Sequence, residues 1–271
     1  MSQPRLFNRA VIRLSPTDDS ENVRDFLQGL VTSDVRGNVA GEVMGEVMGE
    51  VCGGLPGALP VWAGLLSAQG KTMFDFIIWA DPDDARAILI DCEADAAPAL
   101  SKRLSLYRLR RKITIEVDPV RGVYWQTAQT APAALDPRLD ALGYRWIMRA
   151  CDTDVAADDE WLSHRLALGV PEGGSELGDI LWLETNAVDL RGVSFEKGCY
   201  IGQENTARMN WRQKVKRRLV VVPLSRSDEK RRKAAYPDLD LAVDHMRVAD
   251  ITADIVPSWM SLGADAPLVT D

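Results

Sequence analysis

Apolar and polar residues alternate along the first part of the chain in patterns that predict one strand and one amphipathic helix. Residues 5–14 are rich in β-branched side chains and end at a Ser-Pro pair, which is typical of a strand. A helix is expected to start at residues 18–20, where acidic and hydroxyl side chains can cap it, and to end near Gly29. Its apolar positions recur at helical spacing and are Val23, Phe26, Leu27 and Leu30.

The rest of the chain mixes strand-like and helix-like segments. Residues 62–69 and 72–80 are apolar runs around a Gln-Gly-Lys turn, and together they predict a β-hairpin. Further elements are expected as strands at 87–92, 112–117 and 214–224 and as helices at 95–107 and 158–168. Because these elements show no regular strand–helix–strand alternation, the pattern favours an α+β fold over a doubly wound sheet.

Two segments fit neither a helix nor a strand. Residues 41–51 read GEVMGEVMGEV, and a glycine at every fourth position disfavours both structures. We interpret residues 37–60 as an inserted loop, with a functional role for the repeat as the alternative. Residues 127–137 are rich in Ala, Thr and Pro and are expected to form a connector.

The composition is that of a soluble globular protein, with 46% hydrophobic and 27% charged residues among 271. A chain of this length can form one to three domains and needs no disulfide or metal to stabilise a core. The N-terminal residues have no apolar signal core, and no uncharged run reaches 18 residues, so no membrane association is expected. We therefore expect a cytoplasmic, reduced and monomeric protein.

The spacing of cysteines and histidines excludes a self-contained metal site. The four cysteines lie 40, 59 and 48 residues apart, so no CxxC pair occurs. The two histidines are 81 residues apart, so an HExxH motif is absent as well. The cysteines are Cys52, Cys92, Cys151 and Cys199.

The net charge of −8 is distributed unevenly along the chain. Residues 151–190 carry a net −9 and residues 234–271 a net −6, whereas residues 191–233 carry 13 cations and 4 carboxylates, a net +9. The remaining residues, 1–150, are nearly neutral at −2. The acidic average therefore conceals a basic island in which an anion could bind.

Cys199 lies in this basic island, within the segment RGVSFEKGCYIGQENTARMNWRQKVKRR at 191–218. Gly198 and Gly202 bracket it, and good helix formers after Gly202 predict a helix that starts just beyond the cysteine. A helix N-terminus and the neighbouring Lys197 would both lower the thiol pKa and favour the reactive thiolate. The alternative is a buried structural cysteine, the usual state of a free thiol.

Six cations follow the cysteine within residues 208–218, with Trp211 among them. Such a cluster can bind phosphates, nucleic acid or the polyanionic tail of a small molecule. The alternative is that these cations form the solvated face of a strand. They are Arg208, Arg212, Lys214, Lys216, Arg217 and Arg218.

The eight residues KGCYIGQE at 197–204 resemble the signature of the YgfZ-type folate-binding proteins. These are relatives of the glycine-cleavage T-protein, an aminomethyltransferase, and of mitochondrial iron–sulfur assembly factors. The resemblance covers most of residues 5–224. It includes FLQGLVTSDV at 26–35, WAGLLSAQGKTMFDF at 62–76, YRLR at 107–110, DPRLDALGYRW at 136–146 and HRLALGVPEG at 164–173.

The resemblance implies an α+β, T-protein-like ring of three subdomains. Residues 1–213 would form the folate-binding region from two interleaved α+β subdomains, and residues 214–271 a small C-terminal β-barrel. The stretch 225–240 is polar and lacks the glycines of tight hairpins. The C-terminal barrel is therefore expected to be shortened and incomplete.

The resemblance also implies that tetrahydrofolate, or a one-carbon derivative of it, binds in the central channel. This cofactor combines a flat pterin, which needs paired hydrogen-bond donors and acceptors, with an anionic glutamate tail that Arg208 and the cations after it would suit. In the matching N-terminal motifs, the residues expected to line the channel are Gln28, Asp34 and Gln69. Those expected where the second α+β unit approaches the pterin are Arg165, Glu184 and Asn186. The signature contributes Lys197, Gly198, Tyr200, Gly202, Gln203 and Glu204.

The role implied by the resemblance is support for the assembly or repair of iron–sulfur enzymes, including those that modify tRNA. Cys199 is expected to be the reactive residue, with iron–sulfur client enzymes or assembly proteins as partners. One thiol cannot hold a cluster, so Cys199 could attack, carry a sulfur or one-carbon adduct, or donate one ligand to a shared cluster. Direct tRNA binding ranks last, because acidic segments flank the basic island.

The alternative function is that of a folate-dependent aminomethyl- or methyltransferase acting on a small amine, with Asp75 as its catalytic residue. T-protein relatives have two adjacent carboxylates after the hairpin turn, whereas this sequence has Phe74-Asp75. The loss of one carboxylate weakens this alternative. Asp75 could also be an ordinary polar residue on the wet face of a strand.

Overall fold

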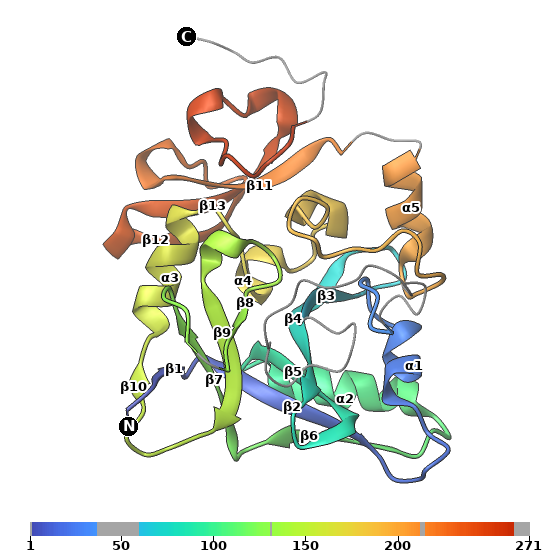
Figure 1. Cartoon of the computed structure of the whole chain (residues 1–271). Coiled ribbons are helices and arrows are strands. Elements are labelled where there is room, and N and C mark those ends of the chain that lie inside the picture. The colour runs from blue at the N-terminus through green and yellow to red at the C-terminus, as the bar shows by residue number, and fades with distance from the viewer. Residues whose placement is uncertain (1, 37–59, 131, 212–214, 263–271) are drawn as a thin grey trace, which may run out of the picture.

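The computed structural model describes residues 2–36, 60–130, 132–211 and 215–262, and these residues form three sheets with helices packed around them (Figure 1). The mixed α+β fold confirms the fold class expected from the sequence. The proposed loop at 37–60, except residue 60, lies outside the described residues, as do Cys52, Arg212 and Lys214.

The first sheet has five antiparallel strands in the order β3-β4-β5-β2-β6. The predicted hairpin is confirmed, because β3 and β4 pair with Leu65 opposite Phe74. Two helices, α1 (Val23–Gln28) and α2 (Ala97–Arg108), cover this sheet through a shared apolar cluster. The strands are β2 (Arg9–Pro16), β3 (Val61–Leu66), β4 (Thr72–Asp81), β5 (Asp84–Glu93) and β6 (Ile113–Asp118).

The second sheet has the order β10-β1-β7-β9-β8, and the chain enters it before the first sheet and returns to it afterwards. The two large sheets are therefore interleaved along the chain, because the second sheet takes strands from before and after the first sheet. Helix α3 (Asp158–Ala167) follows β10 directly. The strands are β1 (Pro4–Leu6), β7 (Arg121–Gln126), β8 (Ala134–Leu135), β9 (Tyr144–Arg149) and β10 (Val155–Ala156).

The single strand expected at 5–14 is wrong, because the chain turns a corner between β1 and β2. At that corner the Asp158 carboxylate accepts hydrogen bonds from the backbone N–H groups of Phe7 and Asn8, at 3.0 and 2.7 Å. These two N–H groups are therefore satisfied by α3 instead of by a neighbouring strand. The corner sends one half of the segment into each large sheet.

The third sheet consists of β11 (Arg217–Pro223), β12 (Arg232–Tyr236) and β13 (Leu241–Arg247) in the antiparallel order β11-β13-β12. Among the described residues these strands do not close into a barrel, which agrees with the expected shortening. Although the stretch 225–240 has no glycine, it forms β12. Asp240, at φ 51°, supplies the left-handed turn residue before β13.

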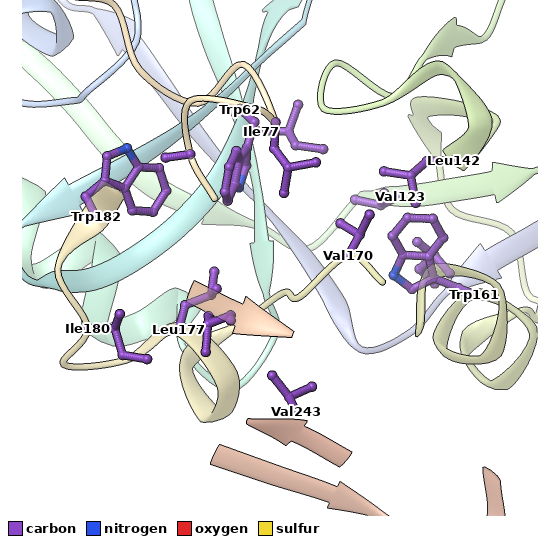
Figure 2. Close-up of a cluster of buried hydrophobic side chains, with 14 of the residues drawn as sticks. Trp62, Ile77, Val123, Leu142, Trp161, Val170, Leu177, Ile180, Trp182 and Val243 are labelled. Atoms are coloured by element: carbon purple, nitrogen blue, oxygen red, sulfur yellow. The ribbon is translucent and has the colours of Figure 1, made fainter. Parts of the chain in front are cut away.

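One apolar core joins all three sheets, as Figure 2 shows. Trp62 of β3 packs on Trp182, with ring centroids 4.8 Å apart, in the short 3-10 helix η2 (Trp182–Thr185). Val123 of β7 and Val243 of β13 are fully buried in the same cluster. The C-terminal sheet is therefore packed onto the larger sheets and not tethered beside them.

A buried ion network accompanies this core. The Arg9 guanidinium binds Asp91 at 2.6 Å, and Arg145 binds Asp91 at 2.8 Å. Asp136 and Glu172 complete the network: Arg145 lies 3.0 Å from Asp136 and 3.4 Å from Glu172. A third cation, Arg138, binds the same two carboxylates at 2.8 and 2.7 Å. Three cations thus balance three carboxylates between the first and second sheets.

Several further expectations need correction at the level of single elements. The first helix begins later than predicted, because Asn22 caps α1 whereas Asp18 forms a separate turn with Ser20. Residues 127–137 contain the short strand β8 and are not only a connector. Strands β7 and β9 were not anticipated. Within the described ranges, no helix has the length and apolar character needed to cross a bilayer.

We predict that the buried ion network makes Arg145 a major contributor to stability. Arg145→Met leaves carboxylates without one of their cations in a dry environment, and such a loss costs about 3–5 kcal/mol of unfolding free energy. The matched control is Arg36→Met, which breaks the exposed Arg36–Asp25 pair and should cost no more than about 1 kcal/mol. Urea denaturation followed by circular dichroism measures both, and equal costs would contradict the prediction.

Candidate functional site

The Cys199 turn, residues 197–202, lies immediately before helix α5 (Gln203–Trp211) and exposes its thiol. The predicted helix after Gly202 is confirmed. Gly202 adopts φ +82°, and a Cβ atom there would lie 2.6 Å from the Ser67 carbonyl oxygen. The turn therefore packs directly against the turn of the β3–β4 hairpin, which only a glycine permits.

The hairpin also holds the start of α5. The Asn205 side-chain amide donates a hydrogen bond to the carbonyl oxygen of Gln69, at 2.6 Å. The Gln69 side chain, predicted from the resemblance to line a folate channel, is exposed beside this contact. The first sheet therefore positions the segment that carries Cys199.

Lys197 anchors the other end of the turn. Its ammonium donates hydrogen bonds to the carbonyl oxygens of Val31 and Ser33 and lies 5.1 Å from the centroid of the Tyr200 ring. Burial lowers the pKa of Lys197 to about 8, against the opposing charge of Asp34. The ammonium of Lys197 is therefore bound to backbone carbonyl groups of the segment that follows α1.

Gln28 links α1 to the same turn. Its side-chain oxygen accepts a hydrogen bond from the Val35 N–H at 3.0 Å, and its amide donates to the Lys197 carbonyl oxygen at 3.4 Å. The structure thereby brings together Gln28, Asp34 and Lys197, three of the residues selected from the sequence. The link makes α1 part of the support of the Cys199 turn.

The remaining residues of the signature lie around α5. Tyr200 is buried and Gln203 half-buried at the helix start. Glu204 and Arg208 are exposed and form an ion pair one helical turn apart, at 2.9 Å. Trp211, at the end of α5, is 76% exposed and lies edge-on to Phe195.

The described cysteines differ sharply in accessibility. Cys92 is buried in the first sheet, where burial raises the pKa of its thiol to about 12 and keeps it protonated. Cys151 and Cys199 are both exposed. The alternative of a buried structural cysteine therefore does not apply to Cys199.

The basic cluster at 208–218 is not one continuous cationic surface. Arg218 is buried, and its guanidinium binds Asp189 at 2.6 Å and the side-chain oxygen of Asn186 at 3.3 Å. Lys216 and Arg217 are exposed at the start of β11. The alternative of a solvated strand face thus fits these two cations but is wrong for Arg218.

The residues expected where the second α+β unit approaches the pterin mainly join the C-terminal sheet to the rest of the protein. Glu184 pairs with His245 of β13 at 2.9 Å. The Asn186 amide donates to the carbonyl oxygen of Leu219 in β11 at 2.8 Å. Arg165 binds the fully buried Glu176 at 2.7 Å, and Glu176 also accepts the hydroxyl hydrogen of Tyr236 in β12. These polar atoms are already satisfied within the protein.

Arg165 is the predicted residue that lines a cavity where the three sheets meet. The cavity has a volume of about 300 Å³. It receives side chains from the β1–β2 corner, the end of β5, α3, the segment before α4 (Gly174–Leu177), α4 itself and β12. Sequence reasoning missed most of its lining, because each residue is unremarkable in its own segment. The missed residues include Arg9, Glu93, Trp161, Glu172 and Tyr236.

Asp75 lies behind this cavity and is buried, so the alternative of a wet strand face is wrong. Its two carboxylate oxygens accept hydrogen bonds from the Trp62 indole N–H and the Gly173 N–H, both at 3.2 Å. Burial raises the pKa of Asp75 to about 6 against the opposing charge of Arg9, and the carboxylate of Glu172 adds to the rise.

The fold resembles that of a solved aminomethyltransferase. The solved aminomethyltransferase T of the glycine cleavage system from Bartonella henselae superposes with a TM-score of 0.60 and 11% sequence identity, over 92% of this chain and 80% of that chain. At this identity the match establishes the architecture alone. It agrees with the T-protein-like arrangement expected from the sequence.

The sequence relatives that this chain matches are named as iron–sulfur cluster assembly factors. The mitochondrial assembly factor IBA57 of Mus musculus is 34% identical over 190 residues, which cover 60% of this chain and 53% of that protein. The IBA57 homologue of Neurospora crassa is 31% identical over 249 residues, 80% of this chain and 52% of that protein. The chain thus spans about half the length of the curated relatives it matches. No protein-family model matches the chain.

The relatives contradict the expected cytoplasmic location. The assembly factors from Mus musculus, Homo sapiens and Neurospora crassa are all named as mitochondrial proteins. The expectation relied on the lack of a secretory signal core and of a membrane-spanning run. Neither feature distinguishes the cytoplasm from mitochondria, so the inference was wrong.

We predict that Asp75 makes stability fall as the pH rises. Because its folded pKa of about 6 lies above the ordinary value of 3.8, the folded state holds an extra proton between these values. The stability present below about pH 4 is then lost as the carboxylate ionises, by about 2 kcal/mol between pH 4 and pH 7.

The measurement is urea denaturation of the wild type and Asp75→Asn across this pH range. The difference between the two proteins should move in favour of Asp75→Asn by that amount as the pH rises. A pH-independent difference would contradict the raised pKa.

Proposed function

We propose that this protein binds tetrahydrofolate, or a one-carbon derivative of it, and supports the assembly or repair of iron–sulfur enzymes, with Cys199 as its reactive residue. The single observation that carries the proposal is the exposed Cys199 thiol on a turn anchored at both ends. The named function of the relatives supports the role in iron–sulfur cluster assembly.

The geometry of the turn suits a thiol that acts on a partner. Lys197 and Gly202 fix the turn against the first sheet, so the thiol is presented from a rigid support and not from a free loop. Among the described residues no group of three or more Cys, His, Asp or Glu side chains could hold a metal ion. Cys199 would therefore attack, carry an adduct or supply one ligand to a cluster shared with a partner.

The cavity at the junction of the sheets fits the pterin end of the folate. Its volume of about 300 Å³ is at the lower end of small-molecule sites. Trp161 and Leu162 supply the apolar part of its lining. Acidic side chains predominate in the lining and could accept the many N–H donors of a reduced pterin; they are Glu93, Asp95, Asp158, Asp159 and Glu172.

The same acidic lining disfavours the glutamate tail, which we place outside the cavity. Arg208, the residue predicted to bind that tail, does not line the cavity and is paired with Glu204. When bound, tetrahydrofolate would supply a carrier for a one-carbon unit. The residues described here would bind and orient its pterin.

A folate-dependent aminomethyl- or methyltransferase acting on a small amine is the second candidate. Its support is the shared fold with aminomethyltransferase T and the buried Asp75 carboxylate. However, both oxygens of Asp75 are engaged by Trp62 and Gly173, and Asp75 does not line the cavity. The contacts therefore favour the first proposal.

The partners that follow from the proposal are iron–sulfur client enzymes or assembly proteins. Direct tRNA binding stays in last place, because the basic cluster is divided between the buried Arg218 and the exposed Lys216 and Arg217. We expect the protein to act as a monomer before it meets a partner.

We predict that blocking the cavity abolishes folate binding. Ser175 is exposed at the cavity, so Ser175→Trp fills it without removing a buried ion pair. The matched control is Ser163→Trp, on the face of α3 that lines a different hollow. Isothermal titration with tetrahydrofolate should show at least a roughly tenfold loss of affinity for Ser175→Trp only. The folate proposal fails if the wild type gives no heat at high micromolar ligand.

We predict that Cys199→Ala loses biological activity without losing stability. The side chain is exposed, so its truncation removes little packing. Complementation of a strain lacking its own assembly factor, read out as the activity of an iron–sulfur enzyme, should fail for Cys199→Ala. Cys151→Ala, at the other exposed thiol, should complement fully. Full rescue by Cys199→Ala would show that its thiol has no chemical role.

A further inference from the structure

A groove on the outer side of the first sheet lies apart from the cavity described above. It has a volume of about 740 Å³ and runs between α1 and the C-terminal end of α2. Its walls are apolar, from Phe26, Leu30 and Tyr107, with Leu109 at its edge. Three cations at the end of α2 and just beyond it surround these walls, and we call the whole the arginine groove; they are Arg108, Arg110 and Arg111.

The arginine groove belongs to a second basic segment that the near-neutral charge of residues 1–150 conceals. Residues 102–112 contain six cations and no carboxylate. Arg111 pairs with Glu21 and Lys112 with Asp18. Within the part of the chain that the structure describes, the other four cations pair with no carboxylate, and they are Lys102, Arg103, Arg108 and Arg110.

Leu109 occupies an unusual backbone position in this groove. It is 85% exposed and adopts φ 50° and ψ −112°, a conformation that glycine tolerates and a leucine does not. The backbone at Leu109 is therefore strained. Because the side chain is almost unburied in the isolated chain, packing does not offset this strain. Such strained residues cluster at active sites, ligand clamps and switch regions.

The arginine groove is linked to the Cys199 turn. Helix α1 joins them, because Gln28 bonds the Lys197 carbonyl oxygen while Phe26 and Leu30 line the groove. Ile201 of the turn packs against the same apolar cluster as Phe26. Figure 1 shows α1 and α5 along one side of the molecule. A molecule seated in the groove would therefore rest against the helix that supports the Cys199 turn.

We propose that the arginine groove docks a partner protein through a short segment in which acidic residues flank an apolar side chain. The inference rests on the proposed function, since the docked partner would be the one whose iron–sulfur site Cys199 serves. The unpaired cations would attract the acidic residues, and the apolar walls with Leu109 would enclose the side chain.

The form of the groove favours a protein segment over nucleic acid or membrane. Phe26 is only 5% exposed, so it forms a floor and offers no open ring on which a base could stack. A lipid surface would meet a protruding apolar face, whereas these side chains line a hollow. An acidic peptide with one apolar anchor matches both the charge and the shape.

The test uses the full chain and a fluorescent peptide with a leucine between glutamates. Two control peptides carry lysines in place of the glutamates or a serine in place of the leucine. By fluorescence anisotropy the first peptide should bind, and both controls should bind at least about tenfold more weakly. Arg110→Glu should weaken binding of the first peptide about tenfold, and added salt should weaken it too. Arg217→Glu, the same charge change on exposed β11, should leave it unchanged.

Leu109→Gly is the variant that separates a role of Leu109 in docking from a role in the fold. Its Tm should be unchanged or higher, because glycine relieves the strain at positive φ, while peptide binding should weaken at least about fivefold. A fall in Tm together with unchanged binding would assign Leu109 to the fold and overturn its docking role.

Other outcomes would overturn the proposal as a whole. These are absence of peptide binding, equal binding of the serine control, or Arg110-dependent binding of single-stranded DNA or phosphatidylserine vesicles in preference to the peptide. Binding that appears only after residues 41–51 are replaced by a Gly-Ser linker would make the occupant a segment of this chain. Tetrahydrofolate titration of Arg110→Glu should match the wild type. Peptide binding with failed folate and Cys199 tests would refute the proposed function and leave the groove intact.

Discussion

The architecture depends on the buried ion network between the two large sheets. The single side chain of Arg145 contacts three carboxylates from separate segments, and it is inaccessible to water. Charges removed from water in this way are tolerated only when every partner is in place, so the network fixes one relative placement of the sheets. The cavity at their junction inherits its shape from that placement, since Arg9 and Glu172 belong to both.

The Cys199 turn depends on the same first sheet, through the β3–β4 hairpin. The absence of a side chain at Gly202 lets the two turns touch, and Lys197 reaches the carbonyl groups at the end of α1. Buried carbonyl acceptors hold an ammonium with little freedom to turn toward the thiol. The position of Cys199 is therefore set by packing, and the chemistry proposed for it would depend on the molecule it meets.

The sequence predicted elements that carry a helical period or a turn signal between apolar runs, and it missed strands whose buried residues show no alternation. Helix α1 has one wet face and a clear helical period, and two apolar runs on either side of a Gln-Gly-Lys turn marked the hairpin, although β3 itself is almost entirely buried. In β7, by contrast, Val123, Tyr124 and Trp125 are buried in succession, so no alternation marks the strand. The Cys199 turn could be predicted because it lies within the eight adjacent residues of the KGCYIGQE signature. The cavity could not, because Arg9 and Glu172 meet only through tertiary packing.

The open C-terminal sheet leaves β11 and β12 as edge strands among the described residues. An edge strand offers unpaired backbone groups to another chain and can seed association, a hazard that a closed barrel would abolish. In β12 the strand register shifts between Arg232 and Ala234, and Lys233 adds a second charge beside the shift. The irregular and charged edge hinders pairing by a second copy, so the shortened sheet can stay unclosed without becoming a site of aggregation.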